Sequence, residues 1–239
     1  MKSLRLLSLF AIGAAPALLA GPCVTGTLQS YIALGTTGCT LGPFTDKDFA
    51  FTDISGIPIT ASDITVTPVF TSTGSGPALS DLEFTSPLFN VTGSQSLKLL
   101  IAYFWDAADI RSLDEVMNDP VTPPALSQLT INGCENANFV GSTCPTTMFT
   151  LLLQAMNLSQ TMVSASENFT PGTVSTLGMR DTIEIDGNNC SPNPSFICAD
   201  ITDFHDTAQT PEPSALLLSL LPAVLGVGLW HRRRHLHAR

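Results

Sequence analysis

Short runs in which apolar and polar residues alternate are the dominant pattern along this chain. Apolar side chains take every second position in the segments 81–84 and 182–185, and nearly so in 64–70. A period of two predicts half-buried β-strands, because successive side chains of a strand point to opposite faces of its sheet. Pro68 places its strand at a sheet edge, since proline cannot donate to the ladder.

One longer segment, Leu97–Trp105, is almost continuously apolar and predicts a strand that is buried on both faces. The residues 195–204 predict a last strand. Stretches rich in turn-forming residues separate these runs, at 71–80, 118–125 and 186–194. Many short strands joined by such turns favour a mainly β fold, an antiparallel β-sandwich or jelly roll.

Two segments do not follow this period. In Asp109–Asn118 the residues Ile110, Leu113 and Met117 have helical spacing, so we expect a short helix there. The segment 150–158 fits a strand or a helix equally well.

The first 20 residues have the order of an export signal. Lys2 and Arg5 precede the apolar stretch 6–12, and small residues then surround a cleavage site after Ala20. The alternative is a buried helix at the start of the folded body.

The other end of the chain carries a second apolar segment. The residues 215–230 are uncharged and mostly apolar, and the cluster Arg232, Arg233 and Arg234 follows them. As a helix they would span ~24 Å, less than the ~30 Å of a bilayer core. The positive-inside rule places the arginines in the cytoplasm and the body outside. Such a marginal transmembrane helix is more typical of a processing signal than of a permanent anchor.

The tripeptide Pro211-Glu212-Pro213, the apolar span and the arginine cluster, in this order, resemble the bacterial PEP-CTERM sorting domain. The segment 23–51 is also similar to the start of many proteins that carry this domain. The resemblance implies recognition by an exosortase in the inner membrane, transient anchoring and cleavage near the motif. It further implies delivery to the surface or the extracellular polysaccharide of a Gram-negative bacterium. The alternative is an ordinary single-pass anchor.

These ends divide the chain into a signal peptide (1–20), a β-rich ectodomain (21–210) and a sorting tail (211–239). The ectodomain holds four basic and 19 acidic residues, a net charge of −15. A surface of this sign repels phosphate backbones, which argues against nucleic-acid binding.

Six cysteines lie in the ectodomain, and an even number in an exported chain predicts disulfides. Fifteen pairings are possible, and proximity favours the three that close short loops: Cys23–Cys39, Cys134–Cys144 and Cys190–Cys198. A metal site is the weaker alternative, because no C-x-x-C occurs and His205 is the only histidine of the ectodomain.

No catalytic constellation is recognisable, and we expect no enzyme and no required cofactor. His205 lies beside carboxylates that a triad would need, but no nucleophile motif accompanies it. Trp105 with Asp106 is a candidate sugar-stacking site, and the alternative is a core aromatic at a strand end. Ca²⁺ is the most plausible ion, with Asp181, Glu184 and Asp186 as candidate ligands, although acidic surface loops explain these residues equally well.

The sequence therefore predicts an exported, non-enzymatic protein with a structural or adhesive role at the cell surface or in the matrix. The alternative is a surface-displayed carbohydrate-binding module, with or without bound calcium. A degradative enzyme is the third and weakest interpretation.

Overall fold

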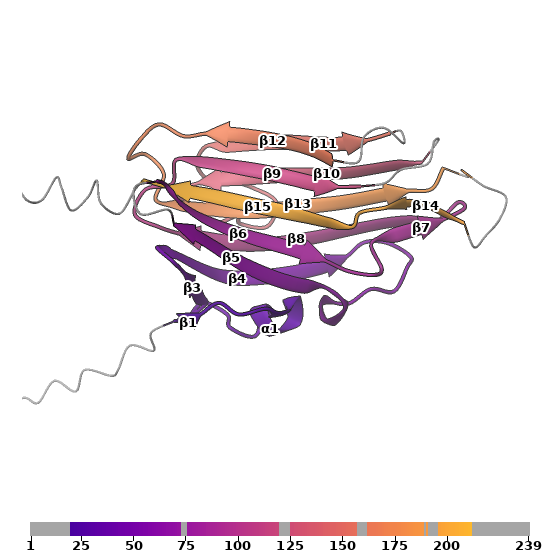
Figure 1. Ribbon diagram of the computed structural model, residues 1–239, viewed down its shortest axis with the longest axis horizontal. Coiled ribbons are helices and arrows are strands. Elements are labelled where there is room, and N and C mark those ends of the chain that lie inside the picture. Colours follow the sequence, from indigo (N-terminus) through magenta and orange to yellow (C-terminus); the bar gives the residue numbers. More distant parts are fainter. Residues whose placement is uncertain are drawn as a thin grey trace, which may run out of the picture.

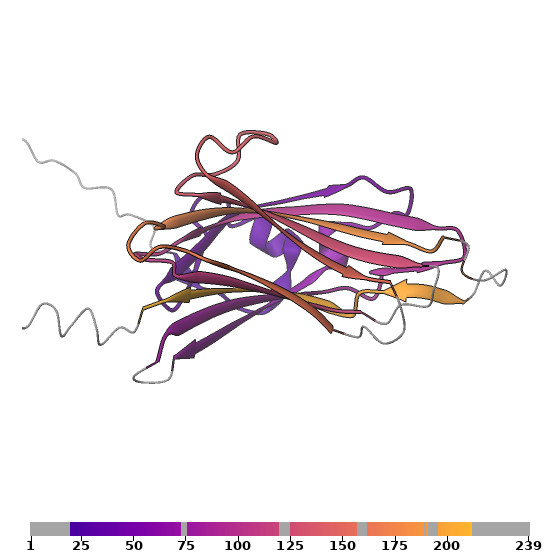
Figure 2. The same ribbon diagram turned by 90° about the horizontal axis from the view of Figure 1, so that it is seen from above.

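The computed structural model shows a β-sandwich, and it describes residues 20–72, 76–119, 125–156, 162–188, 190 and 196–211. Two large sheets lie face to face, and a short ribbon closes one end (Figures 1 and 2). The seven-stranded sheet has the order β1 (Gly21–Pro22), β3 (Cys39–Leu41), β4 (Phe44–Asp53), β8 (Ser96–Asp106), β13 (Thr176–Asp186), β10 (Leu126–Glu135) and β11 (Met148–Ala155).

The six-stranded sheet has the order β12 (Met162–Asn168), β9 (Ser112–Asn118), β15 (Asp203–Thr210), β6 (Ala78–Thr85), β5 (Thr65–Ser72) and β2 (Gly26–Thr27). The end ribbon pairs β14 (Ile197–Asp200) with β7 (Asn90–Thr92). Two short helices complete the described part, α1 (Leu28–Ile32) and the 3₁₀ turn η1 (Ala61–Asp63). The expected mainly β sandwich is confirmed, and only the pair β1–β3 is parallel among the described strand pairs.

The core forms where the inward-facing residues of the two sheets meet. In β8 every second residue is buried: Leu97, Leu99, Ile101, Tyr103 and Trp105. The facing sheet contributes inward phenylalanines, and Tyr103 of β8 packs on Phe84 of β6, which stacks on Phe204 of β15. Full burial of one large apolar side chain stabilises the fold by about 1.5–3 kcal/mol.

The segment 97–105 was expected to be buried on both faces, and this prediction was wrong. Leu100, Ala102 and Phe104 point outward and are partly exposed, because no further sheet of the described residues covers this side of β8. Lys47 also points to this side, and its ammonium lies 5.1 Å from the centre of the Phe104 ring.

The helix expected over Asp109–Asn118 is also wrong, because this segment contains strand β9. Leu113 and Met117 are buried at alternating strand positions, with Glu115 buried between them. Glu115 is an acidic residue at an inward position, so the sequence does not show the alternation of apolar and polar residues that indicates a strand. The ambiguous segment 150–158 falls largely in β11, which is a strand.

Pro68 lies where the sequence placed it, in a strand with one open side. β5 pairs with β6 along its whole length, but β2 pairs only with Val66 and Thr65 of β5. The missing N–H of Pro68 therefore faces a side without a ladder partner among the described strands.

All six cysteines form disulfides, and the pairs are the three that close short loops: Cys23–Cys39, Cys134–Cys144 and Cys190–Cys198. Each bond fastens a loop or a terminal segment to the sandwich. Cys23–Cys39 joins the chain after β1 to β3, and Cys134–Cys144 closes the loop that follows β10.

No helix among the described residues is long and apolar enough to cross a bilayer. The expected signal helix and the expected transmembrane helix at 215–230 lie outside the described residues, as do Glu212, Pro213 and the arginine cluster.

We expect the double substitution Cys134→Ser with Cys144→Ser to lower the free energy of unfolding by about 2–4 kcal/mol, because the open loop regains entropy in the unfolded chain. Denaturant titration of the oxidised protein measures this difference. Equal midpoints for the wild type and the double variant would contradict the stabilising role of this bond.

Candidate functional site

The outer side of the seven-stranded sheet carries rows of polar side chains that run across neighbouring strands. In one row Gln154 of β11 lies opposite Gln128 of β10, which lies opposite Glu184 of β13. The amide Nε2 of Gln154 donates to Oε1 of Gln128 at 2.6 Å, and Nζ of Lys98 donates to Oε2 of Glu184 at 2.8 Å. These residues face outward because strand alternation sends their neighbours into the core.

A second row lies four positions further along the strands. Thr150 is opposite Asn132, which is opposite Arg180. The hydroxyl of Thr150 donates to Oδ1 of Asn132 at 2.9 Å. We call five outward side chains of these rows the amide face: Gln128, Asn132, Thr150, Gln154 and Arg180. Glu184, which is paired with Lys98, borders it.

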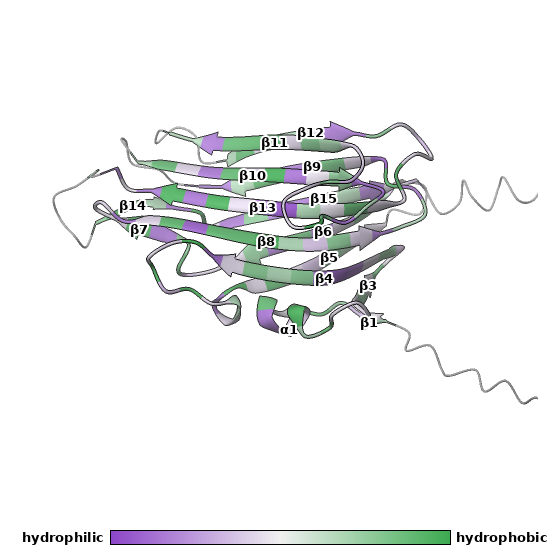
Figure 3. Cartoon of the chain, turned by 180° about the vertical axis from the view of Figure 1, so that it is seen from behind, coloured by the Kyte–Doolittle hydropathy of each residue, from purple (hydrophilic) through white to green (hydrophobic). Residues whose placement is uncertain are grey.

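The loop between β10 and β11 borders the amide face. It projects above the sheet in Figure 2 and crosses in front of β13 in Figure 3. Gly178 of β13 permits this approach, since a Cβ there would lie 2.8 Å from the carbonyl oxygen of Ala137. Phe139 of the loop lies under Arg180, whose guanidinium carbon is 5.3 Å from the ring centre. The loop thus places an aromatic ring against Arg180 of β13, at the margin of the amide face.

The outer side of the six-stranded sheet has the opposite character. Asp81, Glu83, Asp114 and Asp203 lie there, and His205 is the single ring base among them. The ring nitrogens of His205 contact two carboxylates, Nδ1 with Asp81 at 3.2 Å and Nε2 with Asp203 at 3.1 Å. We call this surface the acidic face.

Ligand atoms of Glu83, Asp203 and His205 lie within 4.8 Å of one another, a spacing that suits a metal ion. The electrostatics favour an ion pair instead. The hydrogen bond to Asp81 is the largest of the effects that raise the pKa of His205 to about 9. An imidazolium donates from both nitrogens and has no lone pair for a metal.

A third polar group is enclosed between the sheets. Glu115 of β9 and Asp206 of β15 point inward from one sheet, and Asp181 and Tyr103 point inward from β13 and β8 of the other. The three carboxyl side chains are 0% exposed and Tyr103 is 1% exposed. We call Glu115, Asp181 and Asp206 the core carboxyl group.

Asp206 is the centre of this group. The hydroxyl of Tyr103 donates to its Oδ2, and the carboxyls of Glu115 and Asp181 both lie within hydrogen-bonding reach of it. Burial, followed by repulsion from Asp206, holds the pKa of Glu115 and of Asp181 well above the ordinary range. Burial also raises the pKa of Asp206, against the effect of its hydrogen-bonding neighbours.

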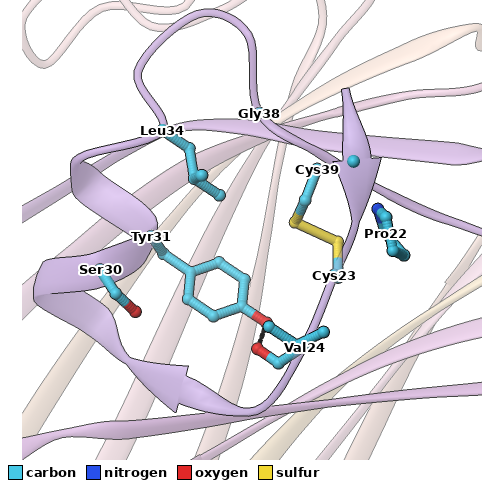
Figure 4. Close-up of a pocket in the computed structure, with 9 residues that line it drawn as sticks. Pro22, Cys23, Val24, Ser30, Tyr31, Leu34, Gly38 and Cys39 are labelled. Atoms are coloured by element: carbon cyan, nitrogen blue, oxygen red, sulfur yellow. Dashed lines mark hydrogen bonds between the residues drawn. A yellow bond between two sulfur atoms is a disulfide. The ribbon is translucent and has the colours of Figure 1, made fainter. Parts of the chain in front are cut away.

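The pocket in Figure 4 lies beside α1 at the start of the body. The disulfide Cys23–Cys39 and the side chains of Tyr31 and Leu34 line it, and its volume is about 170 Å³. The hydroxyl of Tyr31 donates to the carbonyl oxygen of Val24 at 2.9 Å. Pockets for small molecules usually enclose about 300–1,000 Å³, so this one is too small for a sugar chain.

A more polar hollow of about 360 Å³ lies near the end ribbon. Thr85, Asn90, Asp200 and Thr202 contribute its polar lining. Asp200 is its one titratable side chain, and burial raises the pKa of that residue. General acid–base chemistry on a sugar needs a pair of carboxyls, and this hollow presents one.

The structure corrects the candidate sugar site at Trp105 and Asp106. Trp105 is 0% exposed and packs against Tyr103 and Phe44, so it cannot stack on a sugar ring. It points inward because it continues the buried parity of β8. Asp106, the next residue, points outward and pairs with Lys47 at 3.1 Å.

The structure also separates the candidate calcium ligands. Asp181 points into the core, whereas Glu184 and Asp186 lie on the outer side of the same strand. Side chains at odd and even positions of one strand face opposite sides of its sheet. Asp181 therefore cannot share one site with Glu184 and Asp186. Glu184 is instead paired with Lys98.

Sequence reasoning missed the amide face and the core carboxyl group. One strand of the amide face has a local signal, the alternation of Gln128, Thr130 and Asn132 with apolar residues. Its rows combine residues of three strands, however, so they depend on the order of the strands in the sheet. The core carboxyl group combines strands β9, β13 and β15, which lie up to 90 residues apart, and no short motif contains it.

Comparisons with known proteins add little to this description. No family model matches the chain, and no curated protein matches it. Among solved structures, that of TmCBM61 in complex with β-1,4-galactotriose aligns with a TM-score of 0.31 and 6% identity, over 69% of this chain and 88% of that chain. A likeness at this TM-score carries no argument about this protein.

We expect the imidazole of His205 to titrate near pH 9 in the folded protein. The folded pKa lies above the unfolded value of about 6.5, so the ion pairs contribute stability that is complete below that pH and is lost as pH rises towards 9. NMR titration of the ring protons measures the pKa directly.

The substitution Asp81→Asn should lower the pKa of His205, because Asp81 provides the largest stabilising contact. Asp114→Asn is the matched control, since Asp114 is an exposed acid on the same face. A midpoint below 7 in the wild type would refute the ion-pair arrangement.

Proposed function

We propose that this chain is an exported, non-enzymatic protein with a structural or adhesive role at the surface or in the matrix of a Gram-negative bacterium. The observation that carries the proposal is the set of three disulfides, which uses every cysteine of the chain. Disulfides persist in oxidising compartments outside the cytoplasm. They agree with the export signal and with the PEP-CTERM-like tail of the sequence.

The sorting route is part of the same proposal. The apolar span 215–230 inserts into the inner membrane, the arginines stop transfer, and an exosortase cuts near Pro211-Glu212-Pro213. The folded body supports this order of events, because its last strand, β15, ends at Thr210. The cleavage region therefore begins directly where the sandwich ends.

We expect the mature protein from its native host to lack the residues after the cleavage region. Mass spectrometry of the intact protein measures its C-terminus. Replacement of Glu212 by Ala should leave a longer, membrane-bound precursor, whereas Glu167→Ala, in β12, should be processed normally. Recovery of mature protein that ends at Arg239 would show a plain anchor and refute the sorting proposal.

A second candidate function is carbohydrate binding, and the amide face is the observation that favours it. Planar amides and hydroxyls in rows present paired donors and acceptors, which suit the hydroxyl groups of a polysaccharide. Arg180, whose guanidinium carbon lies 5.3 Å from the centre of the Phe139 ring, adds a charged donor to this face. The opposite, acidic face would repel anionic polymers.

We expect Arg180→Ala combined with Gln128→Ala to weaken co-sedimentation with the host's own extracellular polysaccharide by roughly tenfold, the scale of a central contact. Asp114→Ala on the acidic face is the control and should bind like the wild type. Equal binding by all three proteins would exclude the amide face as the sugar-binding surface and leave the structural role.

A further inference from the structure

A buried carboxyl lies against the disulfide Cys23–Cys39. Asp46 of β4 is opposite Cys39 of β3 on one side and opposite Trp105 of β8 on the other. Asp46 is 0% exposed, and its Oδ2 lies 3.4 Å from Sγ of Cys23. Gly38, with a φ of +64°, lets β3 and β4 approach here, because a Cβ at this position would collide with the carbonyl oxygen of Asp46. The carboxyl is therefore in contact with the bond.

This carboxyl has no positive charge to pair with among the described residues. Its Oδ1 has no hydrogen-bond partner there, and Lys47 points to the other side of the sheet, where it pairs with Asp106. Burial is the main cause that raises the pKa of Asp46 to about 8, and the indole of Trp105 opposes this effect only in part. Asp46 is therefore mostly protonated at neutral pH. Its O–H can point at the Cys23 sulfur, which is a weak acceptor.

The other groups around Asp46 do not compete for this proton. Tyr31 is the titratable side chain of α1, and its hydroxyl donates to the carbonyl oxygen of Val24 at 2.9 Å. Burial, followed by the charge of Asp46, raises the pKa of Tyr31 further above its ordinary range. β3 adds no charged side chain, and the residue of β8 opposite Asp46 is Trp105. Asp46 is thus the acid that can exchange a proton with this disulfide.

The same disulfide is open to small molecules from the pocket. Cys23 and Cys39 both line it, and Figure 4 shows the bond facing Tyr31 and Leu34. A volume of about 170 Å³ leaves room for a small organic thiol. Asp46 does not line the pocket, so the bond contacts the pocket and, separately, a buried acid.

The described contacts of the other two disulfides include no acid. Sγ of Cys134 and Sγ of Cys144 each lie 3.6 Å from the hydroxyl oxygen of Thr146. Sγ of Cys198 lies 3.8 Å from the carbonyl oxygen of Gly93. A hydroxyl or a carbonyl does not give up a proton near neutral pH, so neither bond has a proton donor of the kind that Asp46 provides.

We propose that Cys23–Cys39 is a site of thiol–disulfide exchange with small organic thiols, and that Asp46 is its general acid. A thiolate in the pocket attacks Sγ of Cys39 and forms a mixed disulfide, while the bond to Sγ of Cys23 breaks and that sulfur keeps the electron pair. Asp46 donates its proton to the Cys23 sulfur, which leaves a thiol and a carboxylate. Cys39 is the attacked residue because the proton donor lies beside Cys23.

The step is balanced without a further reagent. The sulfur of the small thiol is oxidised as the sulfur of Cys23 is reduced. In the reverse direction the carboxylate of Asp46 takes the proton from Cys23, whose thiolate then attacks the mixed disulfide and expels the small thiolate. This chemistry is independent of the proposed sorting route and of the amide face.

The test uses the oxidised mature protein in its folded state, with 2-mercaptoethanol as the probe. Samples are quenched with iodoacetamide at intervals, and peptide mapping by mass spectrometry follows each disulfide. We expect Cys23–Cys39 to open at least tenfold faster than Cys134–Cys144. The first product should carry mercaptoethanol on Cys39 and the alkyl label on Cys23.

Asp46→Asn should slow the opening of Cys23–Cys39 at least tenfold at pH 7 and leave Cys134–Cys144 unchanged, because only the first bond loses its proton donor. Asp48→Asn is the matched control and should react like the wild type. It removes a carboxyl two residues further along β4, and Asn tolerates the positive φ of 57° at this position.

The pH profile provides a measurement that needs no variant. Divided by the thiolate concentration, the rate for the wild type should fall as pH rises through about 8, since Asp46 then loses the proton that it donates. The same quotient for Asp46→Asn should not change with pH.

Three results would overturn the proposal. They are opening of Cys23–Cys39 no faster than that of Cys134–Cys144, a mixed disulfide formed first on Cys23, and a rate per thiolate that is the same at pH 7 and pH 9 in the wild type. The last result would show that Asp46 is a buried structural residue that takes no part in the exchange.

Discussion

Tyr103 makes the contact that joins the two sheets at the centre of the sandwich. Its ring stacks on Phe49 with a centroid distance of 5.3 Å and packs on Phe84 of the opposite sheet at 5.9 Å. Its hydroxyl reaches Asp206 on that same sheet. One side chain thus provides both apolar contact and a directional bond across the interface. Because Tyr103 and Asp206 both point inward, the neighbouring positions of β8 and β15 point outward, to the two outer surfaces of the sandwich.

The sequence predicted the architecture wherever burial followed apolarity. Ile64, Val66 and Pro68 specified a half-buried edge strand, and the spacing of the cysteines favoured the pairs that form. Prediction failed where charged residues face the core. Because Glu115 interrupts the alternation of apolar residues in β9, the remaining apolar spacing predicts a helix. Asp181 lies close to Glu184 in sequence, but the strand places their side chains on opposite sides of the sheet. A local pattern cannot report which acids will be buried, because burial depends on the strand that packs opposite.

The two outer surfaces differ in a way that composition alone conceals. A net charge of −15 over residues 21–210 suggests a uniformly acidic surface. Three of the four basic residues, Lys47, Lys98 and Arg180, nevertheless lie on the outer side of the seven-stranded sheet, which leaves the other sheet strongly acidic. A protein with two unlike faces can present one to a polymer while the like charges of the other limit association with its own copies. The folded body therefore presents sides of different charge, whereas a body with a uniform surface would present the same charge on every side.

The position of β15 has a consequence for the timing of folding. This last strand of the body lies between β6 and β9, and it is the only described link between β5–β6 and β9–β12 within their sheet. Its partners in β6 precede it by 118 to 132 residues, so the contacts that complete the sheet have a high contact order. In a chain that is still being synthesised or threaded through a pore, β5–β6 and β9–β12 are two unconnected halves of the six-stranded sheet. The six-stranded sheet is complete only when residues 203–210 are in place, so the last strand of the body is also the one on which closure of the sandwich depends.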